Sequence, residues 1–161
     1  MFEIKPEEGY RAPDFCLLEA SEERVCLSET LKGQVQVLIF YPTDFGITCT
    51  LEFKRFEEMT DQFAQAGAGL IGISVNSLHS HRSWKEKMGL SIPLLSDIDA
   101  KISQIYDVMC SEDSILKGHS TRAIFVVDRD QVIRYRWVAS NIHFQPDYGE
   151  ILSKVVEIES A

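Results

Sequence analysis

The sequence predicts one α/β domain, in which a mixed central β-sheet carries helices on both faces. A chain of 161 residues, 45% of them hydrophobic and 25% charged, has the size and composition of a single globular domain. Two runs, Val35–Tyr41 and Leu70–Val75, are almost wholly apolar, as strands buried on both faces are. Helical patterns alternate with these runs, and no repeat or linker divides the chain. We therefore expect one domain over residues 1–161.

Turn residues and apolar spacing define the elements of the first half of the chain. A helix is predicted from about residue 47 to residue 65, because apolar side chains recur there about once per turn. The members of this face are Leu51, Phe56, Met59 and Phe63. Prolines and glycines predict an extended lead-in over residues 1–12. After the lead-in we expect strands at Phe15–Leu18 and Arg24–Leu27, then a helical turn from Ser28 to Gly33 ahead of the strand Val35–Tyr41.

The second half of the chain predicts a similar alternation. Gly89 marks the end of a helix, since glycine favours the left-handed conformation that follows a helix. Residues 128–131 indicate a hairpin turn between two apolar strands. The predicted elements are a helix at Leu78–Met88, an extended piece at Pro93–Ser96, a helix from Asp97 or Asp99 to Tyr106, strands at Ala123–Val127 and Val132–Val138, and a helix at Pro146–Ile158. A β-β-α ending after a βαβ unit is typical of a thioredoxin-like fold.

Charge and hydropathy exclude several classes of function. Sixteen basic and 25 acidic residues give a net charge of −9, which argues against binding to a nucleic-acid backbone. No apolar run reaches the roughly 18 to 20 residues that a membrane span needs. The N-terminal residues Met1–Pro6 lack the basic and apolar stretches of a signal peptide. We therefore predict a cytoplasmic protein that binds neither nucleic acid nor membrane.

The four cysteines are Cys16, Cys26, Cys49 and Cys110. No two of them have the CxxC spacing of a zinc site or of a thioredoxin-like redox pair. In a reducing cytoplasm, a chain with an ample core needs no structural disulfide. Cys16 and Cys26 lie among apolar, strand-like neighbours, so we expect both to be small core residues with free thiols.

Cys49 has a different setting, because it follows the most apolar strand and lies in the first turn of the next helix. Sites in open α/β sheets gather at the carboxyl ends of strands. The unpaired N–H groups and the positive dipole of a helix N-terminus favour the thiolate, which is the nucleophilic form. This placement predicts a pKa below that of a free thiol. On placement alone, a reactive thiol and a small core residue remain equally good interpretations.

The residues around Cys49 form a spaced pattern. Pro42 is followed by three residues, Gly46, two residues and Cys49, with Glu52 three places later. This stretch resembles the active-site segment of the peroxiredoxin (alkyl hydroperoxide reductase C/thiol-specific antioxidant) family, in which the order is Pro, three residues, Thr or Ser, two residues, Cys and then Glu. Further matches in family order are Ala12–Phe15, Ser74–Ser77 with His81 and Trp84, Pro93–Asp97 and Arg122–Asp128. The resemblance thus covers nearly the whole chain and implies a thioredoxin-like fold.

The resemblance implies roles for four residues. Cys49 matches the peroxidatic cysteine, which attacks the O–O bond of a peroxide. Arg122 matches the arginine that stabilises the thiolate and the charge on the transferred oxygen. Pro42 matches the proline that closes the pocket, and Glu52 matches the acid that helps to hold the arginine. The alternatives are a surface salt bridge for Arg122, a simple strand end at Pro42 and a solvated helix face for Glu52.

Gly46 departs from the family pattern, since the family has a hydroxyl residue at this position. One hydrogen bond to the peroxide and the thiolate is then missing, and losing one positioned donor costs on the order of 100-fold in rate. Thr43, three places earlier in a loop, is the candidate to supply the missing hydroxyl. Thr48 is adjacent to Cys49 and is expected to point elsewhere.

Cys110 bears on how an oxidised Cys49 is reduced again. Attack on peroxide yields a sulfenic acid, which a second thiol commonly resolves as a disulfide. No cysteine follows Cys110, and residue 54 is a lysine, so two of the family's resolving arrangements are excluded. Cys110, in the loop before Arg122, is the candidate resolving cysteine. The favoured interpretation is a one-cysteine cycle with an external thiol, which is similar to the one-cysteine or AhpE-like branch.

The activity implied by the resemblance is that of a thiol-dependent peroxidase acting on hydrogen peroxide and small organic hydroperoxides, without metal, haem, flavin or another cofactor. The implied partners are the peroxide, a thioredoxin, glutaredoxin-like or low-molecular-weight thiol reductant, and a second copy in a homodimer or larger homo-oligomer. Two alternatives stay open. Gly46 leaves open a redox-sensing or holdase-like protein with weakened catalysis. A general thiol–disulfide oxidoreductase is the other alternative, and it is disfavoured because no CxxC is present.

Overall fold

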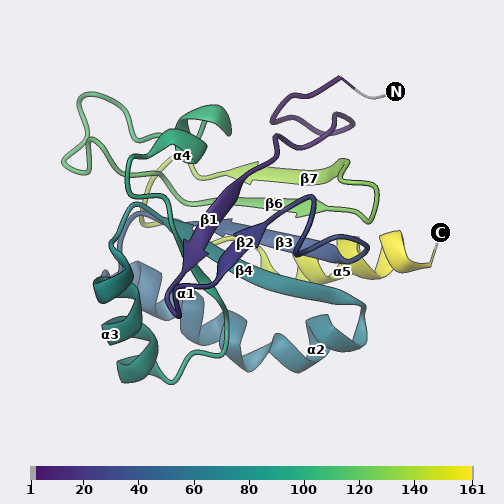
Figure 1. Cartoon of the computed structure of the whole chain (residues 1–161), viewed down its shortest axis with the longest axis horizontal. Coiled ribbons are helices and arrows are strands. Elements are labelled where there is room, and N and C mark those ends of the chain that lie inside the picture. Colours follow the sequence, from purple (N-terminus) through teal and green to yellow (C-terminus); the bar gives the residue numbers. More distant parts are fainter. Residues whose placement is uncertain (1–2, 161) are drawn as a thin grey trace.

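The computed structural model describes residues 3–160. The first two residues of the predicted lead-in over residues 1–12, and the last residue of the predicted domain, lie outside the described residues. The chain forms one seven-stranded mixed sheet in the order β2-β1-β5-β4-β3-β6-β7 (Figure 1). Its strands are β1 (Cys16–Glu19), β2 (Arg24–Cys26), β3 (Val35–Phe40), β4 (Ala68–Ser74), β5 (Leu94–Ser96), β6 (Ala123–Val127) and β7 (Ile133–Val138). Its helices are α1 (Ile47–Glu58), α2 (Thr60–Gln65), α3 (Leu78–Met88), α4 (Lys101–Ile105) and α5 (Tyr148–Glu159). The predicted single α/β domain with a mixed sheet is confirmed.

Apolar side chains project from both faces of the sheet and form two core layers. One layer joins alternate residues of β3 to the inner faces of α1, α2, α3 and α5, and includes Phe53, Phe56, Phe63 and Trp84. The other joins the remaining residues of β3 to α4 and the β1–β2 hairpin, and includes Phe15, Ile102 and Tyr106. Figure 1 shows α4 on the side of the sheet opposite α1, α2 and α3. Because β3 is buried on both faces, its sequence is apolar at nearly every position.

The structure differs from the predicted elements at the first long helix. The predicted helix of residues 47–65 is divided into α1 and α2 at Met59, whose backbone (φ −103°, ψ 1°) leaves the helical conformation. The break turns α2 so that Phe63 stays in the core, with its ring centroid 6.3 Å from that of Phe56. Leu51, which the periodicity placed on the buried face, is 52% exposed. The helix predicted from Asp97 or Asp99 to Tyr106 is shorter in the structure. It begins only at Lys101, because the backbone of Ala100 has a left-handed conformation.

The largest departure from the sequence prediction is a disulfide between Cys16 and Cys26. Antiparallel pairing of β1 with β2 places these residues directly opposite each other, which brings their side chains within bonding distance. The expectation of two free core thiols is therefore wrong, because it depended on strand register, which the spacing of the cysteines did not reveal. Cys49 and Cys110 are free.

The register of β3 against β6 brings the segment that contains Cys49 close to Arg122. Phe40, the last residue of β3, pairs with Ala123, the first residue of β6. Residue 122 therefore lies beside the loop that runs from β3 to α1. Among residues 3–160, none of the helices has the length and apolar character required to cross a membrane.

Candidate active site

Cys49 is the third residue of α1 and lies directly after the loop that follows β3. Gly46 is the N-cap in an extended conformation (φ −66°, ψ 146°), and with no side chain it makes no side-chain cap. Only 2% of the surface of Cys49 is exposed, so the thiol faces into the protein. The predicted position in the first turn of a helix is confirmed.

Arg122 and Glu52 meet at the Cys49 thiol. Nη1 of Arg122 lies 3.3 Å from Sγ of Cys49 and 2.8 Å from Oε1 of Glu52. Glu52 lies three residues beyond Cys49, close to one helical turn, so both side chains lie on the inner face of α1. Arg122 is 1% exposed and Glu52 is fully buried. Neither the surface salt bridge nor the solvated helix face therefore describes these residues.

A backbone carbonyl holds the other side of the guanidinium. The carbonyl oxygen of Ile142 accepts hydrogen bonds from Nη2 (2.7 Å) and Nε (3.3 Å) of Arg122. With the contacts to Cys49 and Glu52, four of the five N–H groups of the arginine are directed at partners. The planar fork is thus held in one orientation, with its charge at the sulfur.

Burial and charge act against each other on these three groups. Burial raises the pKa of the Cys49 thiol, and the Arg122 guanidinium and the backbone N–H of Thr43 offset this rise only in part. The sequence prediction of a pKa below that of a free thiol is therefore wrong for this buried thiol. Burial also raises the pKa of Glu52 to about 7, against the effect of Arg122. Burial lowers the pKa of Arg122, but the neighbouring charges of Glu52 and Cys49 raise it by more.

A cleft of about 290 Å³ opens beside Cys49. Apolar side chains make up much of its wall, and the guanidinium of Arg122 supplies a positive charge within it. The residues that line the cleft are Pro42, Thr43, Gly46, Ile47, Thr48, Cys49, Leu116, Arg122, Ile142 and His143. Pro42 is buried, whereas Thr43 is partly exposed. The structure thus brings Pro42, Thr43 and Gly46 to the same cleft as the cysteine and the arginine.

The hydroxyl of Thr43 is engaged away from the sulfur. Its Oγ1 donates to the carbonyl oxygen of Asp44 at 3.1 Å and accepts from Nδ2 of Asn76 at 3.3 Å. Its methyl carbon instead lies toward Gly46, 3.3 Å from the position that a Cβ would take there. In this conformation Thr43 does not replace the missing hydroxyl, and its effect on Cys49 is that its backbone N–H lowers the pKa of the thiol.

A buried polar network that the sequence analysis did not identify anchors the loop before α1. The carboxylate of Asp44 accepts hydrogen bonds from the hydroxyls of Tyr41 (2.6 Å) and Ser80 (2.8 Å) and lies 2.8 Å from Nδ1 of His81. Nε2 of His81 lies 3.0 Å from the carbonyl oxygen of Leu95. Asp44 and His81 are both buried, so the network ties the loop to α3 and β5. The signals in the sequence were the acidic residue Asp44 inside the matched segment and His81 among the further matches, but nothing in the sequence paired them.

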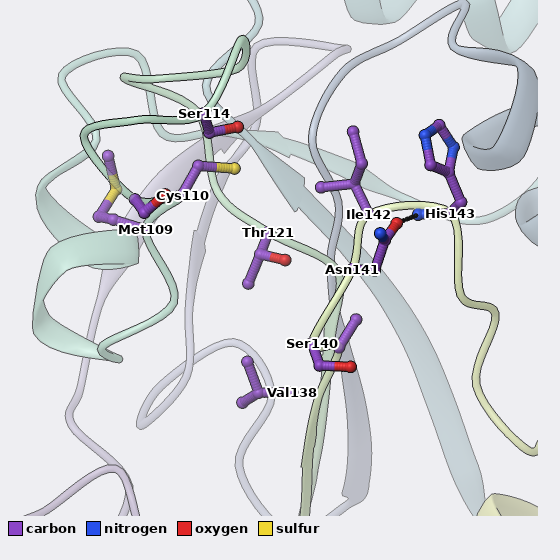
Figure 2. Close-up of a pocket in the computed structure, with 11 residues that line it drawn as sticks. Met109, Cys110, Ser114, Thr121, Val138, Ser140, Asn141, Ile142 and His143 are labelled. Atoms are coloured by element: carbon purple, nitrogen blue, oxygen red, sulfur yellow. Dashed lines mark hydrogen bonds between the residues drawn. The ribbon is translucent and has the colours of Figure 1, made fainter.

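Cys110 lines a second, neighbouring cavity of about 410 Å³. Figure 2 shows Cys110, Met109 and Ser114 on one side of this cavity and Asn141, Ile142 and His143 on the other. Ile142 and His143 also line the cleft at Cys49, so they stand between the two cavities. Burial raises the pKa of the Cys110 thiol. The structure therefore places the two free cysteines in adjacent cavities and not in contact.

Comparison with known proteins agrees with this geometry. Residues 9–136 match the model of the AhpC/TSA family. The peroxiredoxin of Thermoplasma volcanium is 30% identical over 159 residues, which cover 95% of this chain and 73% of the relative. The chloroplastic peroxiredoxin Q of Oryza sativa subsp. japonica is 35% identical over 150 residues, which cover 92% and 66%. The crystal structure of the reduced 2-Cys peroxiredoxin of Plasmodium vivax superposes with a TM-score of 0.83 at 28% identity, covering 95% of this chain and 82% of that one.

The family match spans the β3–α1 loop, the cysteine and the arginine, and it extends over most of the sheet. The solved structure has the same fold over nearly the whole chain. This chain belongs to the AhpC/TSA family and is a peroxiredoxin, a thiol-dependent peroxidase.

Proposed function

We propose that Cys49 is the peroxidatic cysteine of this peroxidase. The observation that carries the proposal is the Arg122 guanidinium 3.3 Å from Sγ of Cys49, beside a cleft that opens to the surface. The thiolate attacks the terminal oxygen of the peroxide, and the O–O bond breaks. Cys49 becomes a sulfenic acid, and the other oxygen leaves with the bonding electron pair and takes up a proton to give water or an alcohol.

Arg122 has two tasks in this step. Its charge favours the thiolate over the thiol, and its remaining N–H can donate to the oxygen on which negative charge develops. A guanidinium already fixed by Glu52 and Ile142 needs no reorganisation in the transition state. Glu52 is therefore a positioning residue, which acts on the peroxide through the arginine.

Pro42 and Thr43 shape the cleft in this proposal. The buried Pro42 lines the cleft beside Cys49 and restricts water there, which strengthens the electrostatic effect of Arg122. The backbone N–H of Thr43 lowers the pKa of the Cys49 thiol. With glycine at position 46 and the Thr43 hydroxyl bound elsewhere, the site has one donor fewer than the family pattern provides. We therefore expect a slower peroxidase than one that carries the full pattern.

The sulfenic acid is reduced in this proposal by an external thiol. One thiol condenses with it to a mixed disulfide and releases water, and a second thiol frees Cys49. Cys110 is separated from Cys49 by the wall that Ile142 and His143 form, so an internal disulfide requires this wall and the first turn of α1 to open. We expect that Cys110 is not required for turnover.

Peroxide consumption in the presence of dithiothreitol tests the assignment. We expect the wild type and Cys110→Ser to consume hydrogen peroxide at similar rates and Cys49→Ser to be inactive. An active Cys49→Ser variant would exclude Cys49 as the nucleophile. A dominant Cys49–Cys110 disulfide in non-reducing peptide maps after one equivalent of peroxide would instead establish a two-cysteine cycle.

A redox-sensing role is the second candidate, and the missing hydroxyl at Gly46 favours it. A sensor would form the sulfenic acid once and turn over slowly, whereas a peroxidase turns over many times. Steady-state assays with excess reductant separate the two. Disulfide exchange with a model peptide, which a general thiol–disulfide oxidoreductase would catalyse, is the control reaction.

We also propose that two copies associate beside the active site. The exposed apolar side chains Phe45, Ile47, Ile115 and Phe144 adjoin residues of the Cys49 cleft. Light scattering should give twice the 18.3 kDa mass of one chain. Ile47→Glu should shift the mass toward the monomer, whereas the control Val156→Glu on α5 should not. The cytoplasmic location and the extent of the domain over residues 1–161 stay predictions, testable by cell fractionation and limited proteolysis.

A further inference from the structure

The Cys16–Cys26 disulfide lies at the edge of the sheet, away from the peroxide site. It joins opposed residues of β1 and β2, and β2 is the outermost strand. Strands β5 and β4 lie between β1 and β3. At about 4.8 Å per strand, β1 is on the order of 14 Å from the strand that leads to Cys49. Direct exchange between this disulfide and Cys49 within one folded chain is therefore excluded.

The two halves of the bridge differ in their access to solvent. Cys16 is an exposed residue, whereas Cys26 is 1% exposed. Cys16 also lines a surface groove of about 560 Å³. Leu17, Leu18, Ser77, Leu78, His79, Ser96, Ile98 and Asp99 form the rest of this groove. An incoming thiolate can thus approach the sulfur of Cys16 but not that of Cys26.

A cation stands at the accessible sulfur. Nη2 of Arg24 lies 3.2 Å from Sγ of Cys16, and Nη1 of the same arginine lies 3.6 Å from the carboxylate of Glu29. A guanidinium at this place attracts an anionic thiol and stabilises a thiolate that forms on Cys16. A bridge that only ties two strands together needs neither the access nor the cation.

The hairpin has other contacts that hold it when the bridge opens. The backbone N–H of Leu27 donates to the carbonyl oxygen of Phe15 at 3.0 Å. The carboxylate of Asp14 accepts from the backbone N–H (3.0 Å) and the hydroxyl (2.6 Å) of Ser28. Phe15 and Leu27 are buried in the core layer of α4. Reduction of the disulfide therefore does not require the domain to unfold.

We propose that the Cys16–Cys26 disulfide is a second redox site, which exchanges with a dithiol reductant independently of Cys49. One thiolate of the dithiol attacks Sγ of Cys16, and the S–S electron pair passes to Cys26, which takes up a proton. The second thiolate of the dithiol then attacks the reductant sulfur that is bonded to Cys16. This closes the disulfide of the reductant and releases Cys16 as a thiolate beside Arg24. The dithiol is oxidised to a disulfide by two electrons, and the bridge is reduced to two thiols.

The test follows reduction of the bridge by dithiothreitol at pH 8 without denaturant. Samples are alkylated at intervals, and peptide mapping reports each cysteine separately, both in the wild type and in the Cys49→Ser/Cys110→Ser double variant. We expect a rate proportional to dithiothreitol concentration and equal in both proteins. A rate independent of dithiothreitol and equal to the rate of global unfolding overturns the proposal. Alkylation of Cys16 and Cys26 before any reductant is added also overturns it.

Variants of Arg24 test the part played by the cation. Arg24→Ala should be reduced about two- to fivefold more slowly, the range that one exposed ionic contact supports. Arg24→Lys should retain most of the rate. Lys32→Ala, which removes a charge from the adjoining exposed turn, should match the wild type. Equal rates for Arg24→Ala and Lys32→Ala would show that Arg24 has no part in the exchange.

Discussion

At the scale of single residues, Gly46 is where this peroxiredoxin departs from its family, and its backbone is compatible with a side chain. Its φ of −66° is one that any residue adopts. A Cβ at this position would lie 3.3 Å from Cγ2 of Thr43 and 3.5 Å from Sγ of Cys49. The contact with Thr43 is tight but involves the end of a partly exposed side chain. A hydroxyl added here would lie next to the reacting sulfur.

We therefore predict that Gly46→Thr raises the second-order rate constant with hydrogen peroxide by about tenfold or more, because it adds a positioned donor. Gly46→Ala is the matched control, since it adds the Cβ without the hydroxyl, and it should give no gain. Stopped-flow measurements decide between them. Equal rates for the two variants would show that the hydroxyl is not what the site lacks.

Glu52 predicts a pH-dependent stability. Its pKa of about 7 in the folded chain lies above the ordinary value of 4.5, so the folded state binds more protons than the unfolded state between these values. The free energy of unfolding should therefore fall as pH rises from about 4.5 to 7, by on the order of 3 kcal/mol from this group. Glu52→Gln should remove this fall. Urea unfolding at pH 5 and pH 7.5 measures it, and parallel pH dependences of both proteins would contradict the assignment.

The sequence was sufficient to identify Cys49, Arg122 and Glu52 as neighbours only through the resemblance of the whole pattern. Local reasoning placed Cys49 correctly in the first turn of a helix, but it gave the wrong direction for the pKa. The helix N-terminus and the arginine, which lower the pKa of Cys49, can be predicted from the sequence. The desolvation that raises this pKa by more arises from packing by segments distant in the sequence. The Cys16–Cys26 bridge was missed for a related reason, since it depends on strand register.

At the scale of secondary-structure elements, the loop between β3 and α1 is held by its own buried anchor. Asp44 accepts hydrogen bonds from Tyr41 and Ser80 and lies against His81, and its backbone N–H donates to Oδ1 of Asn76 at 2.9 Å. The loop that carries Thr43 and the cap of α1 is thereby fixed to α3. Preorganisation of the cleft depends on this contact as well as on Arg122.

We predict that Asp44→Ala destabilises the fold by about 3 to 5 kcal/mol, because it leaves buried partners without their acceptor. Ser80→Ala, which removes one hydrogen bond to the same carboxylate, should cost about 1 kcal/mol. Urea denaturation gives both values. If Asp44→Ala were no less stable than Ser80→Ala, the loop would not be anchored through this carboxylate.

The predicted boundaries of helices agree with the structure where a single residue determines where the helix ends. They differ where packing between helices determines it. Helix α3 ends at Met88 as predicted, because Gly89 takes a left-handed conformation (φ 65°). The division of α1 from α2 at Met59 has no glycine or proline to mark it. It serves the packing of Phe63 on Phe56, which periodicity along one straight helix did not indicate.

At the scale of the whole molecule, the strand order places the peroxide site at Cys49 and the Cys16–Cys26 disulfide on different parts of the sheet. The carboxyl end of β3 and the start of β6 position Cys49 and Arg122, whereas the edge strands β1 and β2 hold the disulfide. Residues far apart in the chain meet at the peroxide site only because β6 inserts next to β3. The fold class was predictable from apolar runs, but this juxtaposition required the family pattern.

The central claim is that the Cys49 thiolate, held by Arg122, is the group that reacts with peroxide. The most direct test is the second-order rate constant of sulfenic acid formation at Cys49 between pH 6 and pH 8, read by mass spectrometry of the trapped sulfenic acid. Because burial holds the pKa of Cys49 above the usual thiol range, the rate should rise about tenfold per pH unit, and Arg122→Ala should lower it about 100-fold or more. A pH-independent rate, an unchanged rate in Arg122→Ala, or trapping first at Cys110 would contradict the account.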